Sequence, residues 1–489
     1  MKLVPSAALV KQSLASHSWL GLMAGAFMFL ICLSGTLVVF YEEFERWEQP
    51  DVVESPRFDP ATIERAYAGF VESGVEVTHH MFVSLPQDGM PRTLISSEKE
   101  GRFINPDGSL GSLVEHEWTH LLVNLHIYLH LPQTFGMIVV SALGALLVGL
   151  IVSGLLAHPR IFKDAFALRL RGSGLLEQAD IHNRLSVWST PFQLMIAITG
   201  AYFGMTLLLS LAMSQVYFDG SKDALMARVF GAEPELEQAA RPLAIEKALT
   251  QMRTIAPDAR PFYLTVEEAD VPEKQYMIVG AELPGRLIYA EQYRFDAAGS
   301  YLGKVGFSDG EAGRQALYSV YRLHFGHFGN FGIKVLYGIL GLAMTVVCVT
   351  GFNIWLARRK RRDHWNHLWA GFVWGAAPAL ASAAVAQVIF GVPALPVFWA
   401  VMLGATALAL WWQNERASKS RLEIAGAAII GMLIASHIIK FGPSAFNVAA
   451  AWVNACFALI ALTLLLTGLF RMRQAEAATR LQMAIPQKT

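Results

Sequence analysis

The hydrophobic pattern along the chain consists of long apolar runs separated by polar segments. The runs lie at residues 18–40, 134–157, 186–213, 331–356, 366–390, 394–412, 422–439 and 447–470. Each is close to the roughly 20 residues that a helix needs to cross a hydrocarbon core. The pattern therefore predicts an all-α transmembrane bundle of eight helices.

The two longest polar segments, residues 42–120 and 214–320, each predict a small α+β domain. Both begin with helical periodicity, as in DPATIERAYAGF, and continue with strand-like stretches such as EVTHHMFVSL and KQYMIVGAEL. They close on GRFINPDGSLG and DAAGSYLG, and Asp107 with Gly108 suits a hairpin turn. The shared order indicates that one unit has been duplicated.

Histidines and glycines around the first four apolar runs repeat with similar spacing. The intervals are 18 residues (His17 to Gly35, His182 to Gly200) and 28 or 27 residues (His126 to Gly154, His324 to Gly351). This repetition predicts a four-helix core from a tandem duplication, followed by four further C-terminal helices.

The lysines and arginines that orient the predicted bundle flank its spans on one side. They are Lys2, Lys11, Arg160, Lys163, Arg169, Arg171, the tract RRKRR at 358–362, Arg416, Lys419, Arg421, Arg471 and Arg473. The short loops on the other side offer only Lys440. The positive-inside rule then predicts that both termini are cytoplasmic. Because no organelle-targeting sequence is recognisable, a bacterial inner membrane is the simplest location.

This orientation gives a predicted order of segments. They are the N-terminus and first span (1–41), a periplasmic domain (42–120), the second span (121–157), a cytoplasmic loop (158–181), the third span (182–213), a second periplasmic domain (214–320), the fourth span (321–357), a cytoplasmic loop (358–365), a four-span extension (366–470) and a cytoplasmic tail (471–489). His17 and His182 then share a depth near the cytoplasmic face, and His126 and His324 share one near the periplasmic face.

Composition narrows the chemistry that these histidines can perform. Charged residues make up 16% of the chain, against roughly 25% in soluble domains, and the formal net charge is zero, so a nucleic-acid partner has no support. The three cysteines lie in apolar runs, so no disulfide or thiolate metal site is expected outside the membrane. No G-x-G-x-x-G follows a predicted strand, so the fingerprint of a flavin or nicotinamide site is missing. No intramembrane carboxylate accompanies the histidines, so the further ligands that zinc needs are missing. Two neutral imidazoles can fill both axial positions of a haem iron, so two b-type haems fit better than zinc or a flavin.

Several motifs, taken in order, resemble the PepSY-associated transmembrane helix family. They are LASHSWLGL with LSGTL, LHIYLHLP, DIHNRL with ITG, YRLHFGHFG with TGFNIWLARR, and the domain ends PDGSLG and DAAGSYLG. The resemblance covers about residues 10–360. It implies two PepSY-like periplasmic domains and an inner-membrane protein linked to iron uptake. Members include di-haem reductases that release iron from ferric siderophores.

The resemblance implies four axial haem ligands: His17 and His182 for the cytoplasmic-side haem, and His126 and His324 for the periplasmic-side haem. His130 and His327 lie four and three residues after two of them, so either could be the true ligand. Arg184 and Arg322 lie within two residues of proposed ligands and would neutralise haem propionates, although positive charge at a membrane boundary is ordinarily an anchor.

The implied function is electron transfer across about 30 Å of hydrocarbon. The donor would be a quinol or a cytoplasmic reductase, and the acceptor a periplasmic ferric siderophore or other ferric chelate. One electron weakens such a chelate, because hard oxygen donors hold Fe(III) better than Fe(II). Membrane lipid is the other expected partner, and no catalytic side chain beyond the haem ligands is assigned.

Two other functions stay open. A non-redox protein would use its small domains to bind peptides or to regulate a protease, and its histidines would be incidental. A transporter would show broken helices and charges at the midplane, whereas the predicted spans are continuous. The C-terminal helices are interpreted as structural support. His79, His80 and Met81 could touch a periplasmic metal, but on an alternating strand they are interpreted as ordinary surface.

Overall fold

The computed structural model describes residues 5–164, 166, 174–359 and 361–484. Four of the cations that predict the orientation, Lys2, Arg169, Arg171 and Lys360, lie outside these residues. The chain forms two compact units. The helical unit comprises Met1–Asp51, His116–Ile198 and Leu336–Thr489, and the sheet unit comprises Val52–Glu115 and Thr199–Val335.

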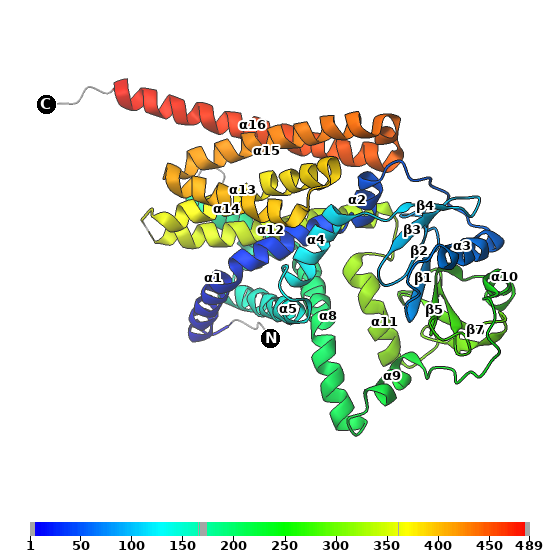
Figure 1. Ribbon diagram of the computed structural model, residues 1–489. Coiled ribbons are helices and arrows are strands. Elements are labelled where there is room, and N and C mark those ends of the chain that lie inside the picture. Colours follow the sequence, from blue (N-terminus) through cyan, green and yellow to red (C-terminus); the bar gives the residue numbers. More distant parts are fainter. Residues whose placement is uncertain (1–4, 165, 167–173, 360, 485–489) are drawn as a thin grey trace. The chain divides into compact units, whose positions relative to one another are not determined.

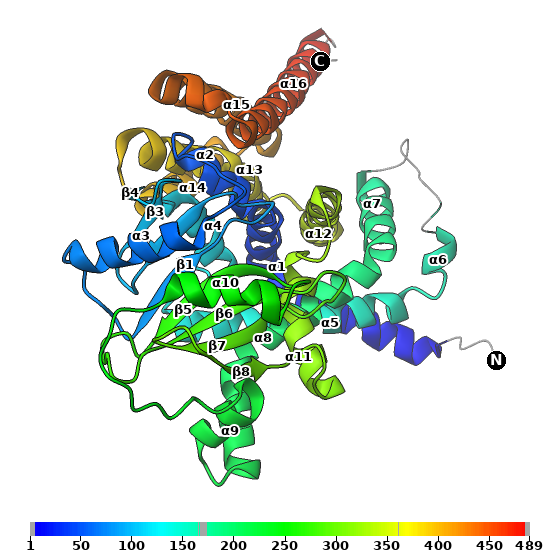
Figure 2. The ribbon, with the colours of Figure 1, turned by 90° about the vertical axis from the view of Figure 1, so that its right-hand side faces the viewer.

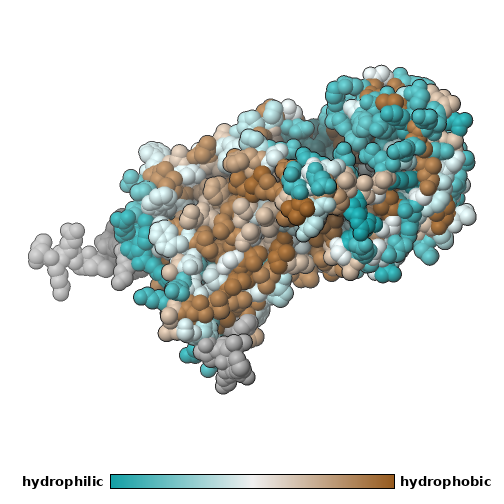
Figure 3. All heavy atoms as spheres, turned by 90° about the horizontal axis from the view of Figure 1, so that it is seen from below, coloured by the Kyte–Doolittle hydropathy of each residue, from teal (hydrophilic) through white to brown (hydrophobic). Residues whose placement is uncertain are grey.

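Within the described residues, eight helices are long and apolar enough to cross a membrane. They are α1 (Ala7–Val38), α5 (Gln133–Ala157), α8 (Thr190–Tyr217), α12 (Phe331–Arg358), α13 (His364–Ala384, continued by a π-helix over Val385–Ile389), α14 (Ala394–Trp412), α15 (Glu415–Phe441) and α16 (Val448–Ala484). These helices confirm the predicted number of candidate spans. Large apolar side chains such as Trp19, Leu403 and Ile439 are exposed on them, and apolar surface covers much of the helical part in Figure 3. An apolar outer surface suits contact with lipid.

Three of the candidate histidines lie on separate short helices ahead of the spans. His126 is on α4 (Glu117–Tyr128), His182 on α7 (Gly174–Trp188) and His324 on α11 (Ala312–Phe325). The continuous helices expected over 121–157, 182–213 and 321–357 are therefore interrupted. Leu129 and His130 take φ of 55° before α5, and Gly326 takes φ of 71° after α11. Helix α8 begins at Thr190 with Pro191 in its first turn, where proline is well tolerated.

The helical unit has one continuous apolar core. Helix α13 packs on α14 and α15, α15 packs on α16, and α1 packs on α4 and α5 (Figure 1). Buried side chains from the N-terminal and C-terminal helices share one cluster, which includes Phe29, Trp118 and Phe398. The short helices α2 (Tyr41–Glu48) and α6 (Ile161–Asp164) complete the unit. The C-terminal helices thus pack directly on the elements that precede them.

The sheet unit contains one eight-stranded antiparallel sheet with the order β4-β3-β2-β1-β5-β6-β7-β8. The strands are β1 (His80–Ser84), β2 (Thr93–Ser96), β3 (Gly101–Ile104), β4 (Leu110–Leu113), β5 (Arg260–Glu267), β6 (Tyr276–Glu282), β7 (Glu291–Asp296) and β8 (Tyr301–Val305). Strand β1 pairs with β5, with His80 opposite Glu267. The two expected small domains are therefore halves of one sheet.

Helices α3 (Pro60–Glu72) and α10 (Ile245–Ile255) lie side by side over one face of this sheet (Figure 2). The strands bury alternate residues there, as β5 does with Phe262, Leu264 and Val266. Turns with Gly108 and Gly299 at positive φ close the last hairpin of each half, as the sequence indicates for Gly108. Helices α9 (Lys222–Phe230) and α11, and α8 from Thr199 onward, also belong to this unit.

Candidate functional site

His17 of α1 and His182 of α7 lie close together in the helical unit. Their ring centroids are 6.2 Å apart and the ring planes meet at 78°. Two imidazoles bonded to one metal ion at about 2.0–2.1 Å each would hold their centroids about 6 Å apart. The structure thus brings together the two histidines predicted for the cytoplasmic side, at a separation that suits a shared metal.

Nδ1 of each ring is hydrogen-bonded to a backbone carbonyl. His17 Nδ1 lies 2.9 Å from the Leu150 oxygen on α5, and His182 Nδ1 lies 3.0 Å from the Val347 oxygen on α12. A carbonyl oxygen only accepts hydrogen bonds, so Nδ1 must carry the hydrogen in both rings. The neutral ring then keeps its lone pair on Nε2, which is the arrangement that metal-ligating histidines ordinarily have.

A glycine lies against each ring on the same partner helix. A Cβ added at Gly154 or Gly351 would be 3.1 Å from Cε1 of His17 or His182, respectively. Each glycine is four residues after the carbonyl that binds Nδ1, and the hydroxyl of the preceding Ser153 or Thr350 is 3.4 or 3.2 Å from Nδ1. The small residue lets the imidazole approach the helix backbone closely enough to reach that carbonyl.

The two histidines line one cavity of about 290 Å³. Its walls come mainly from α1, α5, α7 and α12, and among its described lining residues there is no aspartate or glutamate. Arg358 and His158 also line it, and Arg358 follows Gly351 by seven residues, about two helical turns. Sequence reasoning counted Arg358 only as a membrane-boundary charge, although its helical spacing from Gly351 was visible.

His126 repeats the local arrangement of the first pair, and His324 lies against a glycine with its Nδ1 beside a hydroxyl. His126 Nδ1 lies 2.9 Å from the Ile31 oxygen, and a Cβ at Gly35 would be 2.5 Å from its Cε1. His324 Nδ1 lies 2.8 Å from the Thr199 hydroxyl, and a Cβ at Gly200 would be 3.1 Å from its Cε1. His126 belongs to the helical unit and His324 to the sheet unit, so their mutual pairing stays a prediction.

A family model for the PepSY-associated TM region matches residues 14–358, which is more than half of the chain. The chain belongs to this family. An uncharacterised protein of Pseudomonas aeruginosa, PA4219, is 26% identical over 257 residues, covering 49% of this chain and 63% of that protein. The chain thus spans less than two thirds of the length of this relative. Family membership confirms the expected resemblance and a membrane protein of this type.

The PepSY-associated TM region contains the remaining predicted site residues, which the structure places as follows. His130 follows α4 in a left-handed turn, and its Nε2 is buried without a hydrogen-bond partner among the described residues. His327 follows α11 and lies 6.0 Å from the Tyr321 ring. Among the described residues, His130 and His327 are not among the nearest neighbours of a Cβ added at any glycine. Both stay alternative ligands, but the glycine contacts of His126 and His324, together with the carbonyl at His126 and the hydroxyl at His324, favour His126 and His324.

The two predicted arginines have defined contacts. Arg184 lies 5.7 Å from the ring of Trp188 in a cation–π geometry on α7. Arg322 is buried, and its guanidinium donates to the Glu282 carboxylate at 3.0 Å and to two backbone carbonyls. These contacts tie α11 to the sheet and account for the burial of Arg322. Their role toward propionates stays a prediction.

The family region ends where the C-terminal helices begin, yet these helices support α4, which carries His126. Trp118 Nε1 donates to the Leu380 oxygen on α13 at 3.2 Å. Trp47 of α2 donates to Asn454 of α16 at 2.9 Å and stacks on His437, which donates to the Trp47 oxygen. His437 thus ties α15 to α2, and the interpretation of the extension as structural support stays a prediction.

Glu48 at the end of α2 caps the first turn of α4. Its carboxylate accepts hydrogen bonds from the Trp118 and Thr119 amides at 3.1 and 2.7 Å and from the Thr119 hydroxyl at 2.5 Å. Burial raises the pKa of Glu48 to about 7, although these hydrogen bonds oppose the shift. Sequence reasoning missed this cap, because 71 residues separate Glu48 from Thr119.

We expect Glu48→Gln to change how stability depends on pH. A raised carboxyl pKa means that the folded state binds the proton more tightly than the unfolded state, so the wild type loses stability as pH rises from about 4.5 to about 7. The variant lacks this titration. Thermal unfolding in detergent at pH 5 and pH 8 should therefore show wild type losing stability relative to Glu48→Gln at the higher pH. A difference that stays constant would contradict the burial of this carboxyl.

Proposed function

We propose that this protein is a di-haem b electron-transfer protein of a bacterial inner membrane that reduces ferric chelates on the periplasmic side. The observation that carries the proposal is the pair His17 and His182, 6.2 Å apart at one cavity with Nδ1 of each ring hydrogen-bonded to a carbonyl. The donor set supports haem over zinc, since structural and catalytic zinc sites take three or four protein ligands.

The residues around the cavity fit a haem. His17 and His182 would supply the two axial nitrogens, and the carbonyls of Leu150 and Val347 would hold the rings in the ligating tautomer. Arg358 lines the same cavity and would neutralise a propionate. A bound haem supplies one-electron chemistry, and the apolar lining sets its potential by excluding water.

The carbonyl and glycine contacts of His126 and the hydroxyl and glycine contacts of His324 support a second haem site. A hydrocarbon core about 30 Å thick needs more than one electron carrier between its faces. The distribution of lysine and arginine supports cytoplasmic termini, which would put this second pair on the periplasmic side. The electron would come from a quinol or a cytoplasmic reductase.

The proposed substrate is a ferric siderophore or another ferric chelate with hard oxygen donors. One electron converts Fe(III) to Fe(II), which such donors bind less strongly, so the iron is released without breaking a covalent bond of the chelator. The sheet unit would provide the docking surface. A non-redox peptide-binding protein and a transporter remain the alternatives, and both predict a protein without haem.

Protein reduced with dithionite and freed of excess reductant should reoxidise when mixed anaerobically with a ferric hydroxamate siderophore, and a ferrous trap should collect the iron. His324→Ala should lose most of this rate, because the proposed exit for electrons is gone, while its remaining haem stays reducible. A rate equal to wild type in His324→Ala would contradict the proposed route. No reoxidation of wild type by any ferric chelate would contradict the reductase assignment.

A further inference from the structure

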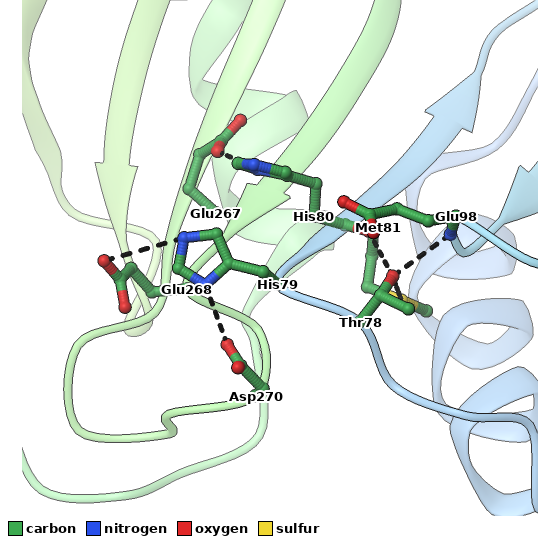
Figure 4. Close-up of polar contacts among 8 residues, drawn as sticks. All are labelled: Thr78, His79, His80, Met81, Glu98, Glu267, Glu268 and Asp270. Atoms are coloured by element: carbon green, nitrogen blue, oxygen red, sulfur yellow. Dashed lines mark hydrogen bonds and ion pairs between the residues drawn. The ribbon is translucent and has the colours of Figure 1, made fainter.

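Acidic and histidine side chains gather where β1 meets β5, at the junction of the two halves of the sheet (Figure 4). His79 directly precedes β1, and Glu268 and Asp270 follow the end of β5. The backbone fixes these segments to each other, because Ala269 N–H donates to the His79 oxygen at 3.0 Å and His80 pairs with Glu267 in the ladder. All of these residues belong to the sheet unit.

Possible ligand atoms of three of the side chains lie near one another. His79 Nδ1 lies 3.1 Å from an Asp270 oxygen, and His79 Nε2 lies 3.8 Å from a Glu268 oxygen. One ligand atom from each residue falls within 4.8 Å of the other two. The two carboxylates face different nitrogens of the His79 ring, and an imidazole binds one ion through one nitrogen only. A metal ion on one nitrogen would therefore need the carboxylate beside the other nitrogen to turn toward it.

A second histidine and carboxylate flank this group. His80 Nδ1 lies 2.5 Å from a Glu267 oxygen, and the His79 and His80 ring centroids are 4.7 Å apart. With neutral imidazoles the three carboxylates leave a concentration of negative charge that favours a cation. Met81 is fully buried in the sheet core, so its interpretation as ordinary surface is wrong and it is not a candidate ligand.

We propose that His79, Glu268 and Asp270 form a binding site for a divalent first-row transition-metal ion. Mixed imidazole and carboxylate ligands suit ions such as Zn²⁺, Mn²⁺ and Fe²⁺, with water completing the coordination. The side chains of His79 and Asp270 are 47% and 48% exposed, so the ion would exchange readily with solvent. This site goes beyond the proposed function: Fe²⁺ would be the product of that reaction, but the site needs neither haem nor reduction.

The test is Co²⁺ and Zn²⁺ binding to the full-length, chelator-treated protein in detergent, by calorimetry and by the visible Co²⁺ spectrum. Wild type should bind about one ion per chain at this site. His79→Ala and Asp270→Asn should each weaken binding by about tenfold or more. Even the loss of a residue that only hydrogen-bonds to a metal ligand lowers metal affinity by about that factor. Glu76→Gln is the matched control, because it removes an exposed carboxylate that pairs instead with Lys99.

The outcome separates the metal site from ordinary ion pairing. Equal Co²⁺ affinity in wild type, His79→Ala and Asp270→Asn would overturn the proposal, as would the absence of any binding to wild type. His79→Gln, which keeps the size and polarity of the side chain but lacks the imidazole, should also lose affinity. Unchanged far-UV circular dichroism in each variant would show that the loss arises at the site and not from unfolding.

Discussion

Replacing either His17 or His182 with alanine should remove one and the same haem. The two rings lie 6.2 Å apart and line one cavity, so each would supply one axial ligand to a single iron. Loss of either nitrogen leaves a site with one protein ligand, and the haem content should fall from about two per chain to about one. The pyridine haemochrome assay on purified protein, normalised to chain concentration, measures this directly.

The control for these variants is His364→Ala, which removes an exposed histidine at the start of α13. Its haem content should equal that of wild type. Redox titration of His17→Ala and His182→Ala should show the same remaining component in both. If the two variants each lost a different component, the pairing of these histidines would be incorrect.

Gly35→Ala should have the second-largest effect, although it adds only one methyl group. The added Cβ would lie 2.5 Å from Cε1 and 2.8 Å from Nδ1 of His126, and both distances are shorter than side-chain atoms tolerate. The ring must then leave the Ile31 carbonyl, so the haem that His126 is proposed to bind should be lost or should change its spin state. Absorption and electron paramagnetic resonance spectra of the purified variant report both changes.

The glycine series provides its own controls. Gly431→Ala introduces a Cβ that meets nothing within 4 Å and should leave the spectra unchanged. Gly154→Ala places its Cβ 3.1 Å from Cε1 of His17, so it should disturb the other haem only partly. Spectra of Gly35→Ala that match those of wild type would show that close approach of ring and glycine has no functional role.

The membrane bundle could be predicted from the sequence because lipid imposes a simple requirement. A span needs about 20 apolar residues, and most of each predicted run falls on one long apolar helix, although the run 186–213 begins at the end of α7. The hairpin at Gly108 was equally predictable, since the turn needs positive φ. Both features depend on local sequence alone.

The partners of the histidines could not be predicted in the same way. The interval from His17 to Gly35 is regular along one helix, but His17 contacts Gly154 on α5, and Gly35 contacts His126 instead. Sequence spacing shows that the two elements repeat, whereas the contact between them depends on how α1 packs on α4 and α5. A requirement for a small residue opposite each imidazole would have suggested these partners.

The joined sheet and the cap on α4 were beyond sequence reasoning for a related reason. Strands β1 and β5 are separated by more than 170 residues, and nothing in either strand alone distinguishes an edge from a pairing partner. Glu48 and Thr119 likewise meet only after the chain has passed through the first half of the sheet. The pairing of β1 with β5 also brings His79 next to Glu268 and Asp270. The alternation of residues around β1 does not reveal these partners, so His79 and His80 were interpreted as ordinary surface.

The haem content of wild-type protein tests the central claim most directly. Protein purified in detergent from haem-replete cells should be red, contain about two haem b per chain by pyridine haemochrome, and show a Soret band that sharpens and shifts on reduction with dithionite. A folded but colourless protein under the same conditions would contradict the assignment of His17, His182, His126 and His324 as haem ligands.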